Sequence, residues 1–280
     1  MPPVLAKAVL VLALLAAGLY LLVAMGMFAF QRQFLFVPME GPIEPAEAGL
    51  FGYELAHFQS ADRLDIPYWR HRPADGSAPL ILFFHGNGGG LHVFAPSLRR
   101  LAEQGFAVGA MAYRGYPGAP GAPSEEALVA DAKLFAQAMT AAEPERPLVL
   151  WGYSLGSGIA TQLAEALDGE RVVVLEAPFT SARDRAGELY PFLPVGWLMR
   201  DPFDSLSRIG SIGSALFVMH GEADGVIPSA HSERLFAAAK EPKLRVSHPQ
   251  ADHFNLEAFG AYDAAFEFIA EHAGAAAPAP

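Results

Sequence analysis

The motif Gly152-Tyr-Ser154-Leu-Gly156 directly follows an apolar run at 147–151 and precedes an apolar pattern of helical spacing. Flanking glycines allow the backbone to bend tightly at such a strand-to-helix turn, so the serine hydroxyl is presented at the edge of a sheet. The motif therefore predicts a nucleophilic serine. A simpler alternative is a glycine-rich turn in which Ser154 only caps the helix, since serine is a favoured N-cap.

A serine nucleophile needs a base, and the base needs a carboxylate to orient it. Asp224 follows the apolar run at 215–219, and His253 lies in the loop after a short strand expected at 246–248. The order Ser154, Asp224, His253 is the chain order of the α/β-hydrolase arrangement. Loops at the carboxyl ends of strands are also where an open α/β sheet binds its ligand. We therefore expect these three side chains to form a catalytic triad.

Each member of this set also has a structural interpretation. Asp224 fits a turn residue before Gly225, and His253 fits a cap or a pair with Asp252. The side chain of Asp252 should project differently from that of Asp224, and Glu176 is a weaker substitute for the acid. The joint occurrence of the three residue types, in the required order and context, favours the catalytic interpretation.

Acyl transfer places negative charge on an oxygen, which backbone N–H groups can stabilise. In this arrangement one donor is the residue after the nucleophile, here Leu155, and another comes from the loop after an earlier strand. The run His85-Gly-Asn-Gly-Gly follows the apolar stretch 80–84. We therefore predict an oxyanion hole formed by Leu155 and Asn87, with Gly88 as the second choice for the latter, and we interpret His85 as a structural residue.

Composition and motifs exclude several other functions. The 280 residues contain no Cys and carry a formal net charge of -11, which excludes disulfide scaffolds, thiol nucleophiles and Cys-based metal sites, and disfavours nucleic-acid binding. A dinucleotide-binding turn fails because Leu91 stands where the third glycine belongs, and no P-loop motif occurs. The nine His residues form no metal-ligand spacing. We expect neither a cofactor nor a metal.

Short apolar runs alternate with segments of helical pattern along most of the chain. Strands are expected at 80–84, 107–113, 147–151, 172–175 and 215–219, and helices at 92–104, 125–142, 155–167 and 230–240. This alternation predicts an α/β fold, the α/β-hydrolase fold, with a mostly parallel sheet flanked by helices. A polar turn at 60–63 separates 53–58 from 64–72, which predicts an antiparallel hairpin at one edge of the sheet.

The Pro-rich region 180–205 interrupts the alternation and is interpreted as a small lid inserted over the strand ends. Its apolar and aromatic residues have three possible roles: to line an acyl pocket, to lie against a membrane, or only to cover the core. These residues are Phe179, Tyr190, Phe192, Leu193, Val195, Trp197, Leu198 and Met199.

The N-terminal segment has no charged residue from Ala8 to Phe30, which is long enough to cross a bilayer. A retained membrane anchor at 1–32 is the favoured interpretation. A cleaved signal peptide, with a small-residue site at 24–26, and a buried hydrophobic hairpin are the alternatives. Lys7 on one side and the acidic stretch after Arg32 on the other favour a cytosolic N-terminus and a catalytic domain on the non-cytoplasmic side.

The remaining chain divides simply. We expect one hydrolase domain at 33–272, because about 240 residues are ordinary for a single α/β domain. The Ala- and Pro-rich end at 273–280 shows no apolar periodicity and is predicted to be a disordered tail. The sequence does not indicate an oligomeric state.

In combination, these motifs resemble the α/β-hydrolase superfamily and, within it, the BEM46-like group of membrane-anchored serine hydrolases. The resemblance covers nearly the whole chain after the anchor. It rests on the segments Gln33-Phe-Leu-Phe-Val-Pro38, His85-Gly-Asn-Gly-Gly89, Tyr113-Arg-Gly-Tyr-Pro-Gly118, Gly152-Tyr-Ser-Leu-Gly156, Glu176-Ala-Pro-Phe-Thr-Ser181, Phe203-Asp204 and His220-Gly-Glu-Ala-Asp224 with Val226-Ile-Pro228. It implies that Ser154, Asp224 and His253 are nucleophile, acid and base. One departure is Ala251-Asp252, where members commonly carry small residues before the catalytic histidine.

The sequence therefore predicts a serine hydrolase of carboxylic esters or thioesters. An anchored site would meet lipid or acyl-protein esters at high effective concentration, which favours apolar acyl substrates. The alternatives are a membrane-tethered binding protein without turnover, and a peptidase or amidase with the same triad.

Overall fold

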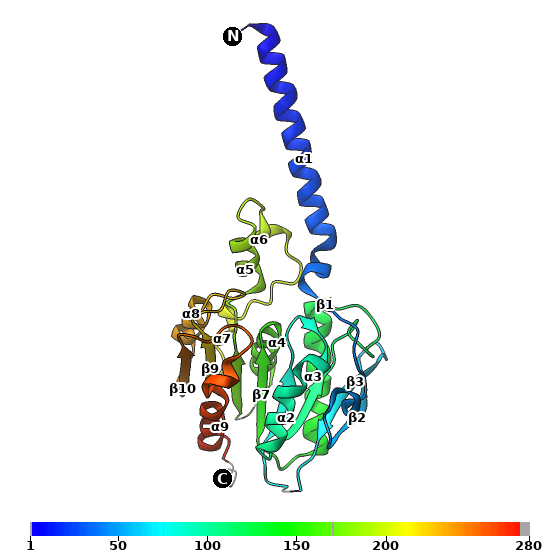
Figure 1. Ribbon diagram of the computed structural model, residues 1–280, viewed down its shortest axis with the longest axis vertical. Helices are drawn as coiled ribbons and strands as arrows, with labels where there is room; N and C mark the ends of the chain where they lie inside the picture. Colours follow the sequence, from blue (N-terminus) through cyan, green and yellow to red (C-terminus); the bar gives the residue numbers. More distant parts are fainter. Residues whose placement is uncertain (1, 75, 168, 170, 275–280) are drawn as a thin grey trace.

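A computed structural model describes residues 2–74, 76–167, 169 and 171–274 of the chain. It begins with one long helix, α1 (Pro3–Leu35), which projects from the rest of the molecule (Figure 1). Within the described ranges, α1 is the one helix long and apolar enough to cross a membrane, and none of its residues is buried. A buried hairpin, one of the sequence-based alternatives, is therefore wrong.

The chain after α1 folds around an eight-stranded sheet with the order β10-β9-β8-β7-β4-β6-β3-β2 among the described residues. All neighbours pair in parallel except β3, which runs antiparallel to both β2 and β6. The strands are β2 (Tyr53–Gln59), β3 (Asp65–His71), β4 (Leu80–Phe84), β6 (Ala107–Met111), β7 (Leu148–Tyr153), β8 (Val172–Glu176), β9 (Ala215–Gly221) and β10 (Lys243–His248). The expected hairpin is thus formed by β2 and β3.

Helices cover both faces of this sheet because its strand side chains alternate between two apolar clusters. In β4, Leu80, Leu82 and Phe84 belong to the first cluster, whereas Ile81 and Phe83 belong to the second. The first cluster includes residues of α3 (Glu125–Ala142), α4 (Leu155–Ala166) and α8 (Ala230–Ala238). The second includes residues of α2 (Ala95–Glu103) and α9 (Ala261–His272).

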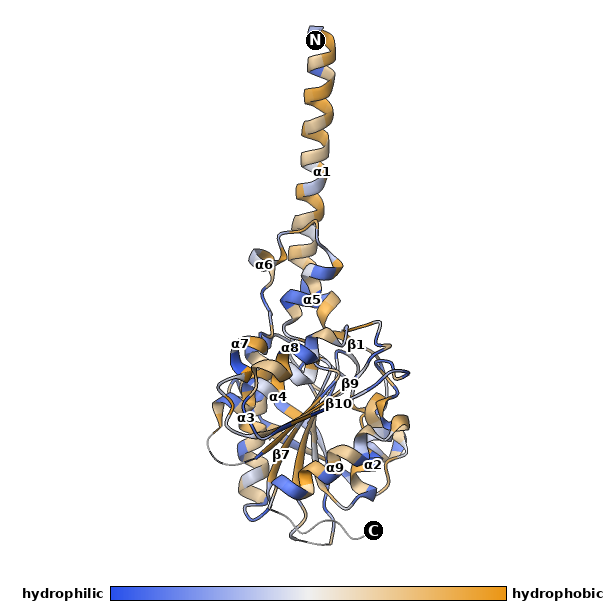
Figure 2. Cartoon of the chain, turned by 90° about the vertical axis from the view of Figure 1, so that its left-hand side faces the viewer, coloured by the Kyte–Doolittle hydropathy of each residue, from blue (hydrophilic) through white to orange (hydrophobic). Residues whose placement is uncertain are grey.

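Residues 180–205, here called the insertion, lie between β8 and the short helix α7 (Leu206–Ile209). The insertion contains α5 (Ala182–Leu189) and α6 (Val195–Leu198), and it stands beside the lower part of α1 at one end of the sheet (Figure 1). Figure 2 shows the insertion against a helix that is apolar along most of its length. The insertion therefore sits where α1 meets the α/β domain.

The short elements complete the chain and show where sequence patterns were least informative. They are β1 (Val37–Pro38), η1 (Pro45–Ala48), β5 (Gly88–Gly89), η2 (Leu91–Phe94) and η3 (Leu256–Phe259). The parallel pairing of β1 with β5 and the C-terminal helix α9 were not predicted. The helix expected at 92–104 begins only at Ala95, after a 3-10 turn, and α1 extends three residues beyond the expected anchor. Most of the tail predicted at 273–280 lies outside the described residues.

Candidate active site

Ser154 occupies a sharp turn between β7 and α4. Its backbone has φ 50° and ψ -116°, a conformation that residues other than glycine rarely adopt. Such strain persists only where the surrounding structure enforces it, and it is common at functional sites. Because the turn lies at the carboxyl end of β7, it directs Ser154 to the end of the sheet at which the insertion stands.

Two glycines make this turn possible. A Cβ atom at position 156 would lie 1.9 Å from the carbonyl oxygen of Phe84, and one at position 152 would lie 2.4 Å from the carbonyl oxygen of Gly156. Both distances are far below a normal contact, so glycine is required for the start of α4 to pack against the end of β4. This packing also brings the turn close to the loop that follows β4.

The structure brings the three side chains of the predicted triad together. His253 Nε2 lies 3.1 Å from Ser154 Oγ, and His253 Nδ1 lies 2.7 Å from Asp224 Oδ2. The residues are 6%, 4% and 7% exposed for Ser154, His253 and Asp224, so the contacts are shielded from water. Because Asp224 accepts at Nδ1, that nitrogen carries the proton of neutral His253, and Nε2 is left to accept the serine hydroxyl proton.

The carboxylate of Asp224 is held by four donors. Oδ1 accepts the backbone N–H groups of Val226 and Ile227, both at 2.8 Å, while Oδ2 lies 2.7 Å from His253 Nδ1 and 3.2 Å from His220 Nε2. Burial acts to raise the pKa of Asp224, but the hydrogen bonds from His220 and His253 outweigh it and hold the pKa below its ordinary value. The acid is therefore ionised and fixed in orientation.

His220 is a neighbour of the acid that sequence reasoning did not single out. It is fully buried, and its Nε2 also lies 2.8 Å from the carbonyl oxygen of Ile227, so this nitrogen donates to two acceptors. The sequence does contain a clue, because His220 is the first residue of the motif His220-Gly-Glu-Ala-Asp224 and stands four residues before the carboxylate. What the sequence did not indicate is that the loop folds back and brings the ring onto the carboxylate.

The two other carboxylates considered as acids lie in different surroundings. Asp252 Oδ1 accepts the backbone N–H of Phe254 at 2.8 Å, which closes a local turn. Glu176 Oε2 accepts hydrogen bonds from Trp151 Nε1 at 2.9 Å and from the Tyr262 hydroxyl at 3.0 Å, in the apolar cluster beneath α9. Burial raises the pKa of Glu176 to about 7.

The predicted oxyanion donors lie at two neighbouring backbone segments. Leu155 is the first residue of α4, and the first N–H groups of a helix have no partner within it. The loop of Asn87 is fixed by its carbonyl, which accepts the backbone N–H of Val37 at 3.0 Å and the Tyr116 hydroxyl at 2.6 Å. Asn87 Nδ2 donates to the carbonyl of Leu35 at 3.2 Å. The end of α1 and the residues that follow it thus hold the loop after β4 in place through hydrogen bonds.

His85 lies beneath this loop. Its ring stacks on Tyr113 with 3.7 Å between ring centroids, and Nδ1 donates to the carbonyl of Gly86 at 2.7 Å. Burial lowers the pKa of His85 to about 3, so the ring is neutral. These contacts fit a structural residue that supports the loop.

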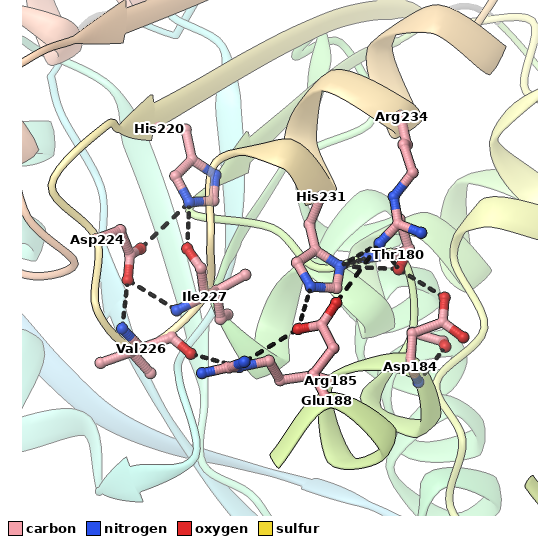
Figure 3. A network of polar contacts seen from close by, with 11 residues as sticks. Thr180, Asp184, Arg185, Glu188, His220, Asp224, Val226, Ile227, His231 and Arg234 are labelled. Carbon is pink, nitrogen blue, oxygen red and sulfur yellow. Dashed lines mark hydrogen bonds and ion pairs between the residues drawn. The ribbon is translucent and has the colours of Figure 1, made fainter. Parts of the chain in front are cut away.

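A polar network joins the insertion to the loop that carries Asp224 (Figure 3). Arg185 of α5 donates from Nε to the carbonyl of Val226 at 2.7 Å and pairs with Glu188 at 3.0 Å. Glu188 Oε2 in turn lies 3.1 Å from Nε2 of His231 on α8, and His231 Nδ1 lies 2.8 Å from Thr180 Oγ1. The position of α5 is therefore tied to the backbone next to the acid.

Known proteins resemble this chain over most of its length. Uncharacterized protein Rv2307c of Mycobacterium tuberculosis is 32% identical over 252 residues, which are 89% of this chain and 88% of the relative. The YfhR protein of Salmonella typhi is 30% identical over 94% of each chain. Lysophosphatidylserine lipase ABHD12 of Danio rerio is 30% identical over 64% of this chain and 52% of its own length.

Family and fold comparisons agree with these relatives. The Hydrolase_4 family, described as serine aminopeptidase S33, matches residues 76–201. An esterase of Pyrococcus furiosus has a TM-score of 0.70 at 17% identity and covers 86% of this chain and 99% of its own. The esterase domain of a Rhodothermus marinus protein has a TM-score of 0.61 at 19% identity, covering 79% and 99%. The finer resemblance to the BEM46-like group stays a prediction. The sequence relatives show that the chain belongs to the family of the Rv2307c and YfhR proteins, and the structural comparisons show that it has the α/β-hydrolase fold.

Proposed function

We propose that this chain is a membrane-anchored serine hydrolase that cleaves carboxylic esters or thioesters with apolar acyl groups. The strongest support is the arrangement of three side chains. The hydroxyl of Ser154, the imidazole of His253 and the carboxylate of Asp224 form a continuous hydrogen-bonded chain at the carboxyl ends of the strands. A nucleophile, a base and an orienting acid in this relation are what acyl transfer requires.

In the first half-reaction, His253 Nε2 takes the proton of Ser154 as the serine oxygen attacks the carbonyl carbon of the substrate. The carbonyl oxygen becomes an oxyanion, which accepts hydrogen bonds from the N–H groups of Leu155 and Asn87. Asp224 stabilises the imidazolium that forms. The intermediate then expels the alcohol or thiol, which receives the proton from His253, and an acyl group remains on Ser154.

In the second half-reaction, His253 removes a proton from a water molecule that attacks the acyl carbon. The second oxyanion uses the same two N–H donors. Its collapse returns the proton to Ser154 and releases the carboxylic acid. No step requires a group beyond the side chains and backbone already named, so we expect hydrolysis to proceed without a cofactor.

The position of the site and the name of one relative favour a lipid substrate. A helix with the length and composition of a membrane span leads directly into the domain, which would hold the site close to a bilayer. ABHD12 of Danio rerio is named as a lipase of a lysophospholipid. We therefore favour lipid esters over acyl-protein esters. The charges that flank the helix favour a catalytic domain on the non-cytoplasmic side.

A peptidase is the second candidate because the matching family is described as a serine aminopeptidase. The same triad can attack an amide if the leaving amine is protonated in the site. Purified full-length protein should therefore be given p-nitrophenyl esters of rising acyl length alongside aminoacyl p-nitroanilides. We expect the esters of longer chains to be cleaved and the anilides to be cleaved at least a hundredfold more slowly.

The triad itself is tested by substitution. Ser154→Ala should lower the kcat for ester hydrolysis by at least a thousandfold, since loss of a triad member leaves only binding and the oxyanion hole. Ser207→Ala, which removes an exposed hydroxyl, is the matched control and should retain full activity. A folded wild-type protein that cleaves no ester or anilide would favour the alternative of a binding protein without turnover.

A further inference from the structure

A hollow lies between the end of α1 and the insertion. Its volume is about 160 Å³, and apart from Gln31 its lining is almost entirely apolar, with Met27 and Phe34 from α1 facing Ala186 and Leu198 from the insertion. A dry apolar cavity of about 150 Å³ is large enough to accept benzene, so this hollow has room for a segment of hydrocarbon chain. The helix that would cross the membrane therefore forms one wall of the hollow.

The outer end of the hollow reaches membrane depth. The insertion follows α1 upward, from Asp201 paired with Arg32 to the carbonyl of Phe192, which accepts the Tyr20 hydroxyl at 3.0 Å. Twelve residues separate those two contacts on the helix, which corresponds to about 18 Å of its axis. A hydrocarbon core of about 30 Å takes up about 20 residues, so a span that starts after Lys7 ends near Met27. The part of the insertion around Phe192, here called its tip, then lies at the depth of the hydrocarbon core.

The side chains at this tip suit such a position. Leu189, Phe192 and Trp197 are 53%, 61% and 93% exposed, which is unusual for large apolar groups but typical of residues at a membrane interface. At the base of the insertion, the exposed Arg200 places its guanidinium 4.2 Å from the ring centroid of Phe28. Lipid-facing groups thus stand above a cation at the level where head groups are expected.

The inner end of the hollow lies at Leu35, which contacts the loop of the predicted oxyanion donor Asn87. Leu35 lines the hollow, and its carbonyl accepts Asn87 Nδ2. Leu35 and Met199 also pack against the first apolar cluster of the core. A chain lying in the hollow would therefore end beside the loop that carries Asn87.

We infer that the hollow receives the acyl chain of a lipid ester that enters sideways from the bilayer, between α1 and the insertion. This inference rests on the proposed function and specifies its substrate class and its route of entry. The anchor helix then has two tasks, because it tethers the domain and also forms half of the acyl site. The ester carbonyl reaches Ser154 while the head group stays near Arg200 at the surface.

The test uses full-length protein in phosphatidylcholine vesicles with two substrates, 1-oleoylglycerol in the bilayer and water-soluble p-nitrophenyl acetate. Ala186→Trp fills the hollow from the insertion, and Met27→Trp fills it from α1, outside the hydrolase domain. In both variants the ratio of kcat/KM for oleoylglycerol to that for p-nitrophenyl acetate should fall at least tenfold. Ala141→Trp, on an exposed position of α3, is the control and should leave both activities unchanged.

Each other outcome has a distinct meaning. An unchanged ratio in Met27→Trp, or equal losses on both substrates, would overturn the acyl route. Wild-type protein that cleaves p-nitrophenyl acetate but not oleoylglycerol would also overturn it, while leaving the proposed hydrolase intact. Wild-type protein that cleaves neither substrate would contradict the proposed function itself.

Discussion

The pKa values of two buried carboxyl groups near the strand ends are shifted in opposite directions. Asp224 has a pKa below its ordinary value, so its contribution to stability is present above pH 4 and is lost as the pH falls. Glu176 has a pKa raised by burial to about 7, so the folded chain keeps a proton that the unfolded chain releases near pH 4.5. Its contribution is complete below pH 4.5 and is lost as the pH rises through 7. Asp224 should therefore limit the stability of the fold at low pH, and Glu176 should limit it as the pH rises through 7.

The Glu176 effect can be isolated by Glu176→Gln, which keeps a carbonyl oxygen for Trp151 and Tyr262 but removes the titration. In the wild-type protein, ionisation of Glu176 should lower the free energy of unfolding by about 3 kcal/mol between pH 4.5 and pH 8. Thermal unfolding at several pH values should show that the variant loses less stability over this range. Parallel curves for the two proteins would contradict the assignment.

His220 should act as a positioning residue for Asp224. A hydrogen bond to a charged group is worth about 1.5–3 kcal/mol, so His220→Leu should lower kcat about tenfold to a hundredfold with little change in KM. His220→Gln retains a side-chain N–H at similar reach and should recover part of the loss. Steady-state kinetics on a short ester would measure this. Equal activity of the Leu and Gln variants would show that the hydrogen bond has no role.

At the scale of elements, α5 of the insertion buries little beyond Ala182 and is held mainly by polar contacts. Glu188 joins Arg185 of α5 to His231 of α8, and Arg185 continues to the Val226 carbonyl (Figure 3). Movement of α5 would therefore shift the backbone at Val226, two residues after Asp224. Elements with few buried contacts open most easily, so α5 is expected to exchange its amide hydrogens faster than the sheet.

Glu188→Ala removes the contacts to Arg185 and His231 together. Amide hydrogen exchange across 182–189 should then accelerate at least fivefold, while exchange in β7 stays unchanged. Glu54→Ala removes the ion pair between Glu54 on β2 and Arg70 on β3, and it serves as the control because β2 lies at the other edge of the sheet from β10. Exchange in α5 that is equal in wild type and Glu188→Ala would mean that other contacts hold the insertion.

The sequence predicted the central strands well because each is a continuous apolar run buried on both faces, as in Val172–Glu176. The order of Ser154, Asp224 and His253 also predicted which side chains would meet. Less local features escaped prediction. The pairing of Val37–Pro38 with Gly88–Gly89 and the approach of His220 to Asp224 depend on how loops pack. No periodic pattern records such contacts.

At the scale of the whole molecule, α1 is the feature that distinguishes a membrane protein from a secreted one. If the anchor is retained, alkaline carbonate should leave the chain in the membrane pellet, and mass spectrometry should detect peptides that include Lys7. The physical reason is that a helix of about 20 apolar residues is stable across the hydrocarbon core. A soluble protein that lacks its first 25 or so residues would instead establish the signal peptide.

The central claim is that Ser154 is a nucleophile activated by His253 and Asp224. Its most direct test is to treat the full-length protein with a fluorophosphonate and to map the adduct by mass spectrometry. We predict a single adduct on the peptide that contains Ser154, no adduct in Ser154→Ala, and labelling at least a hundredfold slower in His253→Ala. An adduct on a different serine, or labelling that is unaffected by loss of His253, would contradict the account.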